Sequence, residues 1–128
     1  MALTQSLARG TDEPAIRDIT LGALLEWAAQ TAPDRIALIA GVANPAERRQ
    51  WTYRELHEQA RRAARALQLR FKPGERVAIW APNIPEWVMM EFGAAMAGVV
   101  LVTVNPGFRS AEVEYVLKQS RSAGIFVV

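Results

Sequence analysis

The sequence predicts an α/β fold in which helices pack against a parallel sheet, and two observations predict it. From Arg76 onward, short apolar runs of strand length alternate with longer helical patterns, which is the βαβ signature. The run from Val99 to Val104 consists only of β-branched residues and leucine, as is typical of parallel strands covered on both faces. We therefore expect a partial subdomain with a parallel βαβαβ sheet, preceded by a helix and a short β-hairpin.

The length and composition are those of one folded domain. The chain has 128 residues, of which 51% are hydrophobic and 22% charged, close to the average for globular proteins. Residues 1–18 mix small, polar and proline residues without sustained periodicity, and we expect a flexible leader there. Residues 19–128 are expected to form the ordered part.

The first ordered elements are predicted to be a helix and a hairpin. The helix should begin after Thr20, whose hydroxyl can cap it, and end before Pro33. Its apolar residues recur at helical spacing, namely Leu21, Leu24, Leu25 and Ala28. The runs from Ile36 to Ala40 and from Gln50 to Tyr53 suit two strands that pair across a polar loop.

A longer amphipathic helix follows the hairpin. Thr52 and Glu55 have the spacing of a capping box, in which each side chain satisfies a backbone N–H that a helix start leaves unpaired. The helix should continue to about Arg70. Its predicted buried stripe is Leu56, Ala60, Ala63 and Leu67.

The remaining elements give the βαβαβ unit. We expect a strand from Arg76 to Trp80 and then a helix from Ile84 to Ala97, with Asn83 and Glu86 at capping-box spacing. After the strand that ends at Val104, Ser110 is the expected cap of a last helix. A final strand is predicted at residues 125–128.

The composition and charge of the sequence do not support several classes of protein. There is no cysteine and only one histidine, His57, so neither a disulfide framework nor a metal cluster is expected. A net charge of +2 does not indicate nucleic-acid binding. No signal peptide and no membrane span are predicted, so we expect a cytoplasmic protein. We interpret Arg61, Arg62 and Arg65 as a solvated helix face, since such charged faces are common.

Two loops form the candidate ligand-facing edge. Ligands of open parallel sheets gather beyond the carboxyl ends of the strands, so loops 81–85 and 105–109 should lie together. The helix N-terminus after each loop, with Arg109 alongside, could accommodate an anionic ligand. A plain Pro-Gly turn explains the 105–109 loop equally well. No glycine-rich nucleotide loop and no nucleophile elbow occurs, so no catalytic residue is assigned.

The order of motifs from about Thr20 to Val128 resembles the N-terminal part of the acyl-adenylate-forming superfamily. The segments that carry the resemblance are Trp51-Thr52-Tyr53-Arg54-Glu55-Leu56, Pro73-Gly74-Glu75-Arg76-Val77-Ala78-Ile79, Ala81-Pro82-Asn83-Ile84-Pro85-Glu86-Trp87, Ala97-Gly98-Val99-Val100 and Val104-Asn105-Pro106. Each one alone is a turn or a cap, and the ordered series is what makes the resemblance specific.

The resemblance implies an enzyme that activates a carboxylic acid with ATP and Mg²⁺ to an acyl-adenylate and, in the acyl-CoA synthetase branch, transfers the acyl group to coenzyme A. The sequence from Val104 to Arg109 is more similar to that of fatty-acyl-CoA ligases than to that of peptide-synthetase adenylation domains. By the same resemblance, Asn105, Pro106, Gly107 and Phe108 face coenzyme A. The family's phosphate loop and catalytic lysine have no counterpart here, so we expect residues 19–128 to be the start of a larger adenylate-forming domain.

The sequence leaves other functions open. The chain could belong to an adenylation domain or a luciferase-like enzyme of the same superfamily, or it could be an α/β interaction module without turnover. In the ligase reading, its partners are the remainder of the parent chain, the acid and coenzyme A, and these residues alone are expected to be inactive. Because a sheet edge and apolar helix faces would be uncovered, self-association is also expected.

Overall fold

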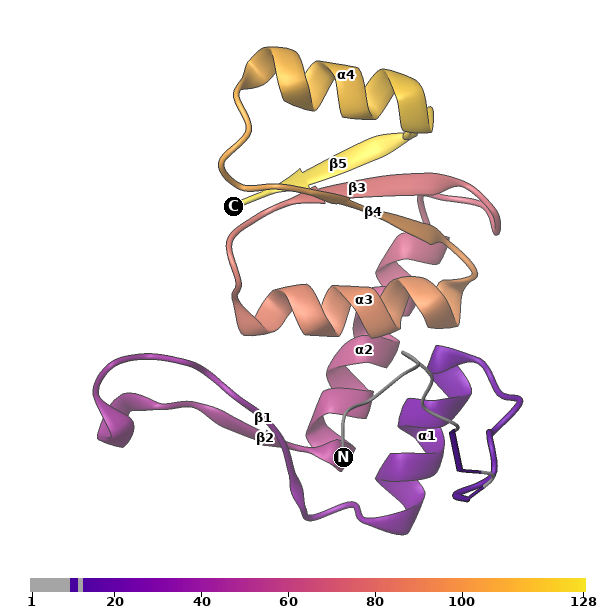
Figure 1. Ribbon diagram of the computed structural model, residues 1–128, viewed down its shortest axis with the longest axis vertical. Helices are drawn as coiled ribbons and strands as arrows, with labels where there is room; N and C mark the ends of the chain where they lie inside the picture. The colour runs from indigo at the N-terminus through magenta and orange to yellow at the C-terminus, as the bar shows by residue number, and fades with distance from the viewer. Residues whose placement is uncertain (1–9, 12) are drawn as a thin grey trace, which may run out of the picture.

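The computed structural model describes residues 10–11 and 13–128 and confirms the predicted order of elements (Figure 1). The elements are α1 (Leu21–Thr31), β1 (Ile36–Ile39), a 3₁₀ turn (Pro45–Glu47), β2 (Gln50–Thr52), α2 (Tyr53–Gln68), β3 (Arg76–Trp80), α3 (Pro85–Ala97), β4 (Val100–Val104), α4 (Ser110–Ser120) and β5 (Gly124–Val127). Most of the leader that we expect at residues 1–18 lies outside the described residues, so that division of the chain stays a prediction.

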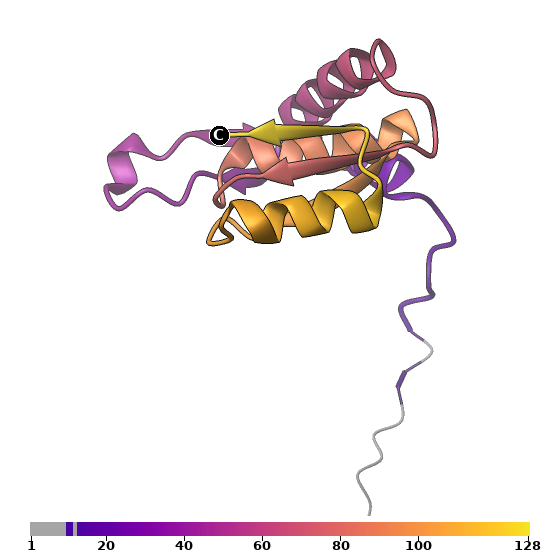
Figure 2. The ribbon, with the colours of Figure 1, turned by 90° about the horizontal axis from the view of Figure 1, so that it is seen from above.

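The three strands β3, β4 and β5 form a parallel sheet in the order β4-β3-β5, with β3 in the centre. Figure 1 shows α4 on one face of this sheet and α3 on the other, with α2 crossing behind α3. β1 and β2 pair antiparallel as a separate hairpin, and Figure 2 shows this hairpin reaching away from the sheet. The parallel sheet and the hairpin are therefore both as the sequence predicts.

The centre strand is buried on both faces, and its side chains alternate between two clusters. Val77 packs with Leu67 and Ala97 on the side of α2 and α3. The next residue, Ala78, packs with Val104 and Val113 on the side of α4. This alternation follows from the pleat, which points successive side chains to opposite faces. The apolar sequence of β3 after Arg76 thus reflects a strand covered on both sides, whereas β4 at the sheet edge stays partly open, with Val100 and Thr103 exposed.

The capping box at the start of α2 forms as predicted. The Thr52 hydroxyl accepts a hydrogen bond from the Glu55 backbone N–H at 3.2 Å, and the Glu55 carboxylate accepts one from the Thr52 backbone N–H at 2.8 Å. The backbone N–H of Thr52, and then its hydroxyl, hold the pKa of Glu55 below its ordinary value of 4.5. The box therefore stabilises the helix start most when Glu55 is ionised.

We expect the capping box to give a measurable acid sensitivity. Because the pKa of Glu55 is lowered on folding, its stabilising effect is present above pH 4.5 and is lost as the pH falls through the folded value. Thr52→Ala should lower the free energy of unfolding at pH 7 by about 1 kcal/mol. Glu55→Gln should flatten the decline of stability with acid, as followed by urea denaturation at a series of pH values. An unchanged decline in Glu55→Gln would show that other groups cause it.

The caps of α3 and α4 differ from the sequence prediction. α3 begins after Ile84 with no side-chain cap, so the expected Asn83–Glu86 box is wrong. Pro85 takes the first helical position, which suits its fixed φ and moves the cap one residue along. α4 is capped at Arg109 and not at Ser110, because the Glu112 carboxylate accepts the Arg109 backbone N–H at 2.8 Å.

The predicted apolar stripe of α1 is only partly buried. Leu25 is 2% exposed, whereas Leu21 and Leu24 are 54% and 37% exposed. The face that carries Gly22 turns toward α3, where Met96 packs so closely that an added Cβ on Gly22 would lie 3.0 Å from its side chain. In α2, similarly, Ala64 is buried together with the predicted Leu56, Ala60 and Leu67, and Ala63 is half-buried.

Candidate functional site

The two loops that follow β3 and β4 lie at the same edge of the sheet and line one pocket of about 560 Å³. This arrangement follows from the parallel pairing of Trp80 with Val104, which brings both carboxyl ends together. The residues that line the pocket are Ala81, Pro82, Asn83, Trp87, Thr103, Val104, Asn105, Pro106 and Phe108. The structure thus brings together three of the four residues that the resemblance nominates, namely Asn105, Pro106 and Phe108.

The loop after β4 is held in place by hydrogen bonds of its own. The indole N–H of Trp80 donates to the Asn105 backbone carbonyl at 3.1 Å and so ties the two strand ends together. The Asn105 side-chain oxygen accepts from the Gly107 backbone N–H at 2.9 Å, which is an Asx turn. The second of these hydrogen bonds uses the Gly107 backbone N–H within the loop.

Gly107 is therefore placed differently from its neighbours. It does not line the pocket, and a Cβ at this position would lie 3.3 Å from the Asn105 side-chain oxygen. Phe108, in contrast, is half-buried against the cluster of Ala78 and Val113 and also forms a wall of the pocket. Phe108 can offer a ligand a rigid apolar surface, whereas Gly107 shapes the turn that presents it.

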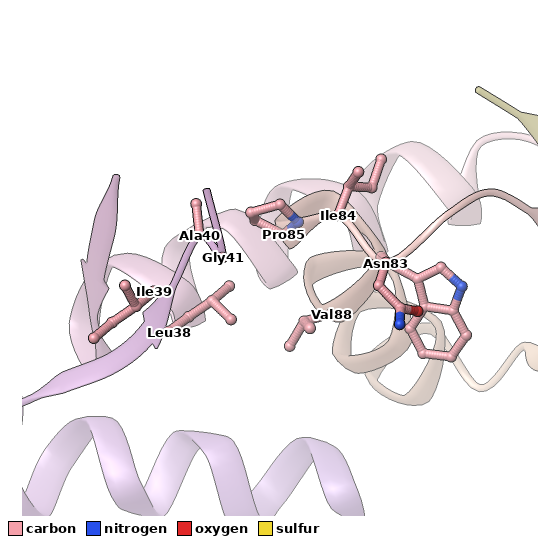
Figure 3. A pocket seen from close by; sticks show the side chains of 9 residues that line it. Leu38, Ile39, Ala40, Gly41, Asn83, Ile84, Pro85 and Val88 are labelled. Atoms are coloured by element: carbon pink, nitrogen blue, oxygen red, sulfur yellow. The ribbon is translucent and has the colours of Figure 1, made fainter. Parts of the chain in front are cut away.

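A second pocket of about 220 Å³ adjoins the first on the other side of the β3–α3 loop (Figure 3). It is lined by Leu38, Ile39, Ala40, Gly41, Asn83, Ile84, Pro85, Trp87 and Val88. Asn83 and Trp87 line both pockets, so the start of α3 separates them. Sequence reasoning missed the contribution of the hairpin, because no local signal places β1 beside a helix more than forty positions later.

The two helix N-termini at this edge are where the sequence suggests that an anionic ligand could be accommodated. Both helix N-termini carry a carboxylate of their own in the first turn, Glu86 in α3 and Glu112 in α4. Glu86 lies 3.8 Å from Arg49 of the hairpin loop, and Glu112 accepts the Arg109 N–H. Neither carboxylate lines the pocket itself, and the residues that do are all neutral.

No metal site is visible in the described residues, since none of their histidine and carboxylate side chains gather in groups of three or more. His57 is half-buried on α2, far along the chain from the strand-end loops, and is not part of the pocket. Over residues 10–11 and 13–128, no helix has the combination of length and hydropathy that crossing a membrane requires.

The chain belongs to the AMP-binding enzyme family, which residues 25–128 match. Among its relatives, the human mitochondrial medium-chain acyl-CoA ligase ACSF2 is 36% identical over 115 residues, which cover 89% of this chain and 18% of the ligase. The chain spans about a fifth of the length of the curated relatives that it matches. This membership confirms the resemblance drawn from the motifs.

Two solved structures show the same fold. The N-terminal subdomain of Klebsiella oxytoca NpsA, in complex with anthranilyl-AMSN, has a TM-score of 0.76 at 28% identity, covering 84% of this chain and 27% of that one. The Mycobacterium tuberculosis fatty acyl CoA synthetase has a TM-score of 0.73, also at 28% identity, covering 84% of this chain and 21% of that one. The architecture is thus that of an adenylation N-terminal subdomain, shared by acyl-CoA synthetases and other adenylate-forming enzymes.

Proposed function

We propose that this chain is the N-terminal part of an ATP-dependent acid–CoA ligase that acts on a fatty acid of medium or long chain. The observation that carries this proposal is the 34–38% identity to acyl-CoA synthetases and ligases over most of the chain. The likeness to NpsA favours a second candidate, an adenylation domain that activates an acid without forming a CoA thioester. The sequence relatives favour the ligase.

The pocket between the strand-end loops is proposed to hold the pantetheine arm of coenzyme A. This arm alternates amides with short apolar segments, and the lining offers Phe108 and Trp87 for apolar contact and Asn83 and Thr103 for hydrogen bonds. No carboxylate is among the residues that line the pocket, so a neutral arm can bind there without a charged side chain losing its hydration. Coenzyme A would supply the thiol that accepts the acyl group, and the residues here would position the arm and exclude water around it.

ATP and Mg²⁺ are proposed for the whole enzyme and not for these residues. Charge neutralisation at the phosphates calls for a metal with basic side chains and backbone donors. The described residues present no metal-binding cluster, and the two helix ends beside the pocket carry carboxylates of their own. The residues that activate the acid are therefore proposed to lie in the portion of the relatives that this chain does not span.

The enzyme is also proposed to act in the cytoplasm.

Replacing Phe108 tests the proposed pocket. Phe108→Ala removes one wall of the pocket, and we expect the affinity for coenzyme A to fall about tenfold, the loss that an aromatic contact of about 1.4 kcal/mol gives. Binding would be measured by isothermal titration of desulfo-coenzyme A into the folded chain. The matched control is Tyr115→Ala, an aromatic residue of α4 that is 64% exposed and does not line this pocket.

Two outcomes would contradict the assignment of the pocket. One is equal affinity of Phe108→Ala and the parent chain, and the other is an equal loss in Tyr115→Ala. Because Phe108 also packs against the core, the far-ultraviolet circular dichroism and the unfolding midpoint of the variant are measured alongside, and Phe108→Leu, which keeps an apolar wall, should retain most of the affinity.

The sheet edge at β5 supports a further proposal, that this chain alone self-associates. Among the described residues, β5 pairs with β3 alone, and its residues Ile125, Phe126 and Val127 are each more than a third exposed. Beside them lies an apolar groove of about 450 Å³ between β5 and the helices α2 and α3. Sedimentation should give a mass above 14.2 kDa that rises with concentration, and Phe126→Lys should shift the chain toward the monomer. A monomer at all concentrations would contradict this proposal.

A further inference from the structure

A groove of about 540 Å³ lies between α1 and α2, away from the strand-end pocket. It is lined by Thr20, Gly22, Ala23, Glu26, His57, Arg61, Ala64, Arg65, Gln68, Ala95 and Met96. None of these residues lines the pocket at the sheet edge. The proposed coenzyme A site therefore leaves this groove without an explanation.

One wall of the groove is a row of basic and polar side chains on α2. His57, Arg61 and Arg65 follow one another at four-residue intervals, so they lie on the same side of the helix. Arg62, which the sequence groups with them, does not line the groove. All three arginines are exposed, and the structure divides them into two that line the groove and one that does not.

The spacing of this row has an energetic cost that an anion would remove. Like charges four residues apart on a helix repel each other, and Arg61 and Arg65 stand at this spacing. In the part of the chain that the structure describes, neither guanidinium forms an ion pair. The contrast within the same molecule is Lys118, which has Glu114 at the favourable four-residue spacing.

The rest of the groove sets the character of its occupant. The facing wall is the start of α1, whose first turn contains no acidic residue, and Glu26 is the one carboxylate in the lining. Ala64, Ala95 and Met96 add apolar surface. A groove of this size is in the range of small-molecule sites, and it combines two unpaired guanidinium groups with an apolar area.

We propose that the groove between α1 and α2 binds a phosphate-bearing organic molecule of nucleotide size. The phosphates lie against Arg61 and Arg65, whose forked guanidinium groups match phosphate oxygens in pairs. The organic body lies over Ala64 and Met96, and Gln68 can donate a hydrogen bond at the end of the row. This site is independent of the acyl-CoA ligase proposal, because it shares no residue with the strand-end pocket.

The test is a titration of the 128-residue chain with adenosine 5′-diphosphate as the probe. Heteronuclear NMR should show saturable shifts of the Gly22, Ala64 and Ala95 amides, which line the groove. Arg61→Ala and Arg65→Ala should each weaken binding about tenfold, as expected for the loss of a charge-assisted hydrogen bond. Arg61→Lys keeps the positive charge but lacks the forked guanidinium group. Its affinity for the probe should therefore lie between that of Arg61→Ala and that of the parent chain.

The matched control is Arg62→Ala, which removes the same charge from the same helix outside the groove and should change the affinity less than twofold. An equal loss in Arg62→Ala would mean that only the diffuse charge of the helix attracts the probe, and this would overturn the proposal. Shifts confined to the strand-end pocket, or no saturation below about 10 mM, would overturn it as well. Phe108→Ala should leave this titration unchanged, so the two sites fail or succeed separately.

Discussion

Gly93→Ala is expected to destabilise the protein strongly, although alanine is the better helix former. Gly93 lies where α3 crosses α2, and an added Cβ would lie 2.6 Å from the Ala63 Cβ and 3.0 Å from the Ala60 backbone carbonyl oxygen. Helix propensity favours alanine over glycine by about 1 kcal/mol. The steric clash is larger, because it involves backbone that cannot rotate away, so the two helices must separate.

We expect a net loss of about 2 kcal/mol in the free energy of unfolding, within the range for overpacked cores. Urea denaturation followed by circular dichroism measures it. Gly41→Ala is the control, since nothing lies within 4 Å of a Cβ there. Ala63→Gly in the Gly93→Ala background removes the shortest contact and should restore part of the loss. A Gly93→Ala protein that is as stable as the parent would contradict the close crossing of α2 and α3.

Leu67→Ala is expected to have the other large effect on stability. Leu67 is 2% exposed and packs against Val77 and Ala97, where α2 meets the sheet. Truncation of a buried leucine costs about 2–5 kcal/mol through lost burial and the cavity that remains. Leu67 also borders the apolar groove beside β5, where the structure can relax, so we expect the lower half of this range.

The same helix end supplies a matched control for this prediction. Leu69, two residues further on, is 84% exposed, and Leu69→Ala should change the free energy of unfolding by less than about 0.5 kcal/mol. Both variants lose the same atoms, so the difference between them isolates burial. Equal effects at the two positions would contradict the orientation of α2 on the sheet.

The helices and strands of this fold could be predicted from the sequence because the patterns that indicate them are local. The capping box of Thr52 and Glu55 lies within one turn, and the apolar run of β4 indicates a strand, although its place at the sheet edge leaves Val100 and Thr103 exposed. The caps of α3 and α4 are also local, yet two candidates compete at each. Pro85 at the first helical position places the cap of α3 at Ile84, and the Glu112 carboxylate places the cap of α4 at Arg109.

The candidate sites were less accessible to sequence reasoning because they depend on packing between distant elements. Parallel pairing could be predicted, and with it the meeting of the 81–85 and 105–109 loops. Two other features could not be predicted, because they leave no periodic pattern in the sequence. These are the hydrogen bond from Trp80 to Asn105 and the pocket wall that β1 adds beside α3. The division of the arginines likewise depends on how α1 packs against α2 and α3, where Gly22 of α1 closely approaches Met96 of α3.

The proposed ligase activity is best tested on the protein encoded by the complete reading frame that carries this sequence, with carboxylic acids as substrates. Purified protein would be assayed for ATP–pyrophosphate exchange with a series of fatty acids, and then for thioester formation on addition of coenzyme A. We expect exchange with a medium- or long-chain acid, conversion to the acyl-CoA, and no exchange by residues 1–128 alone. Exchange without any thioester would instead support an adenylation enzyme, and the absence of exchange with every acid would contradict the ligase proposal.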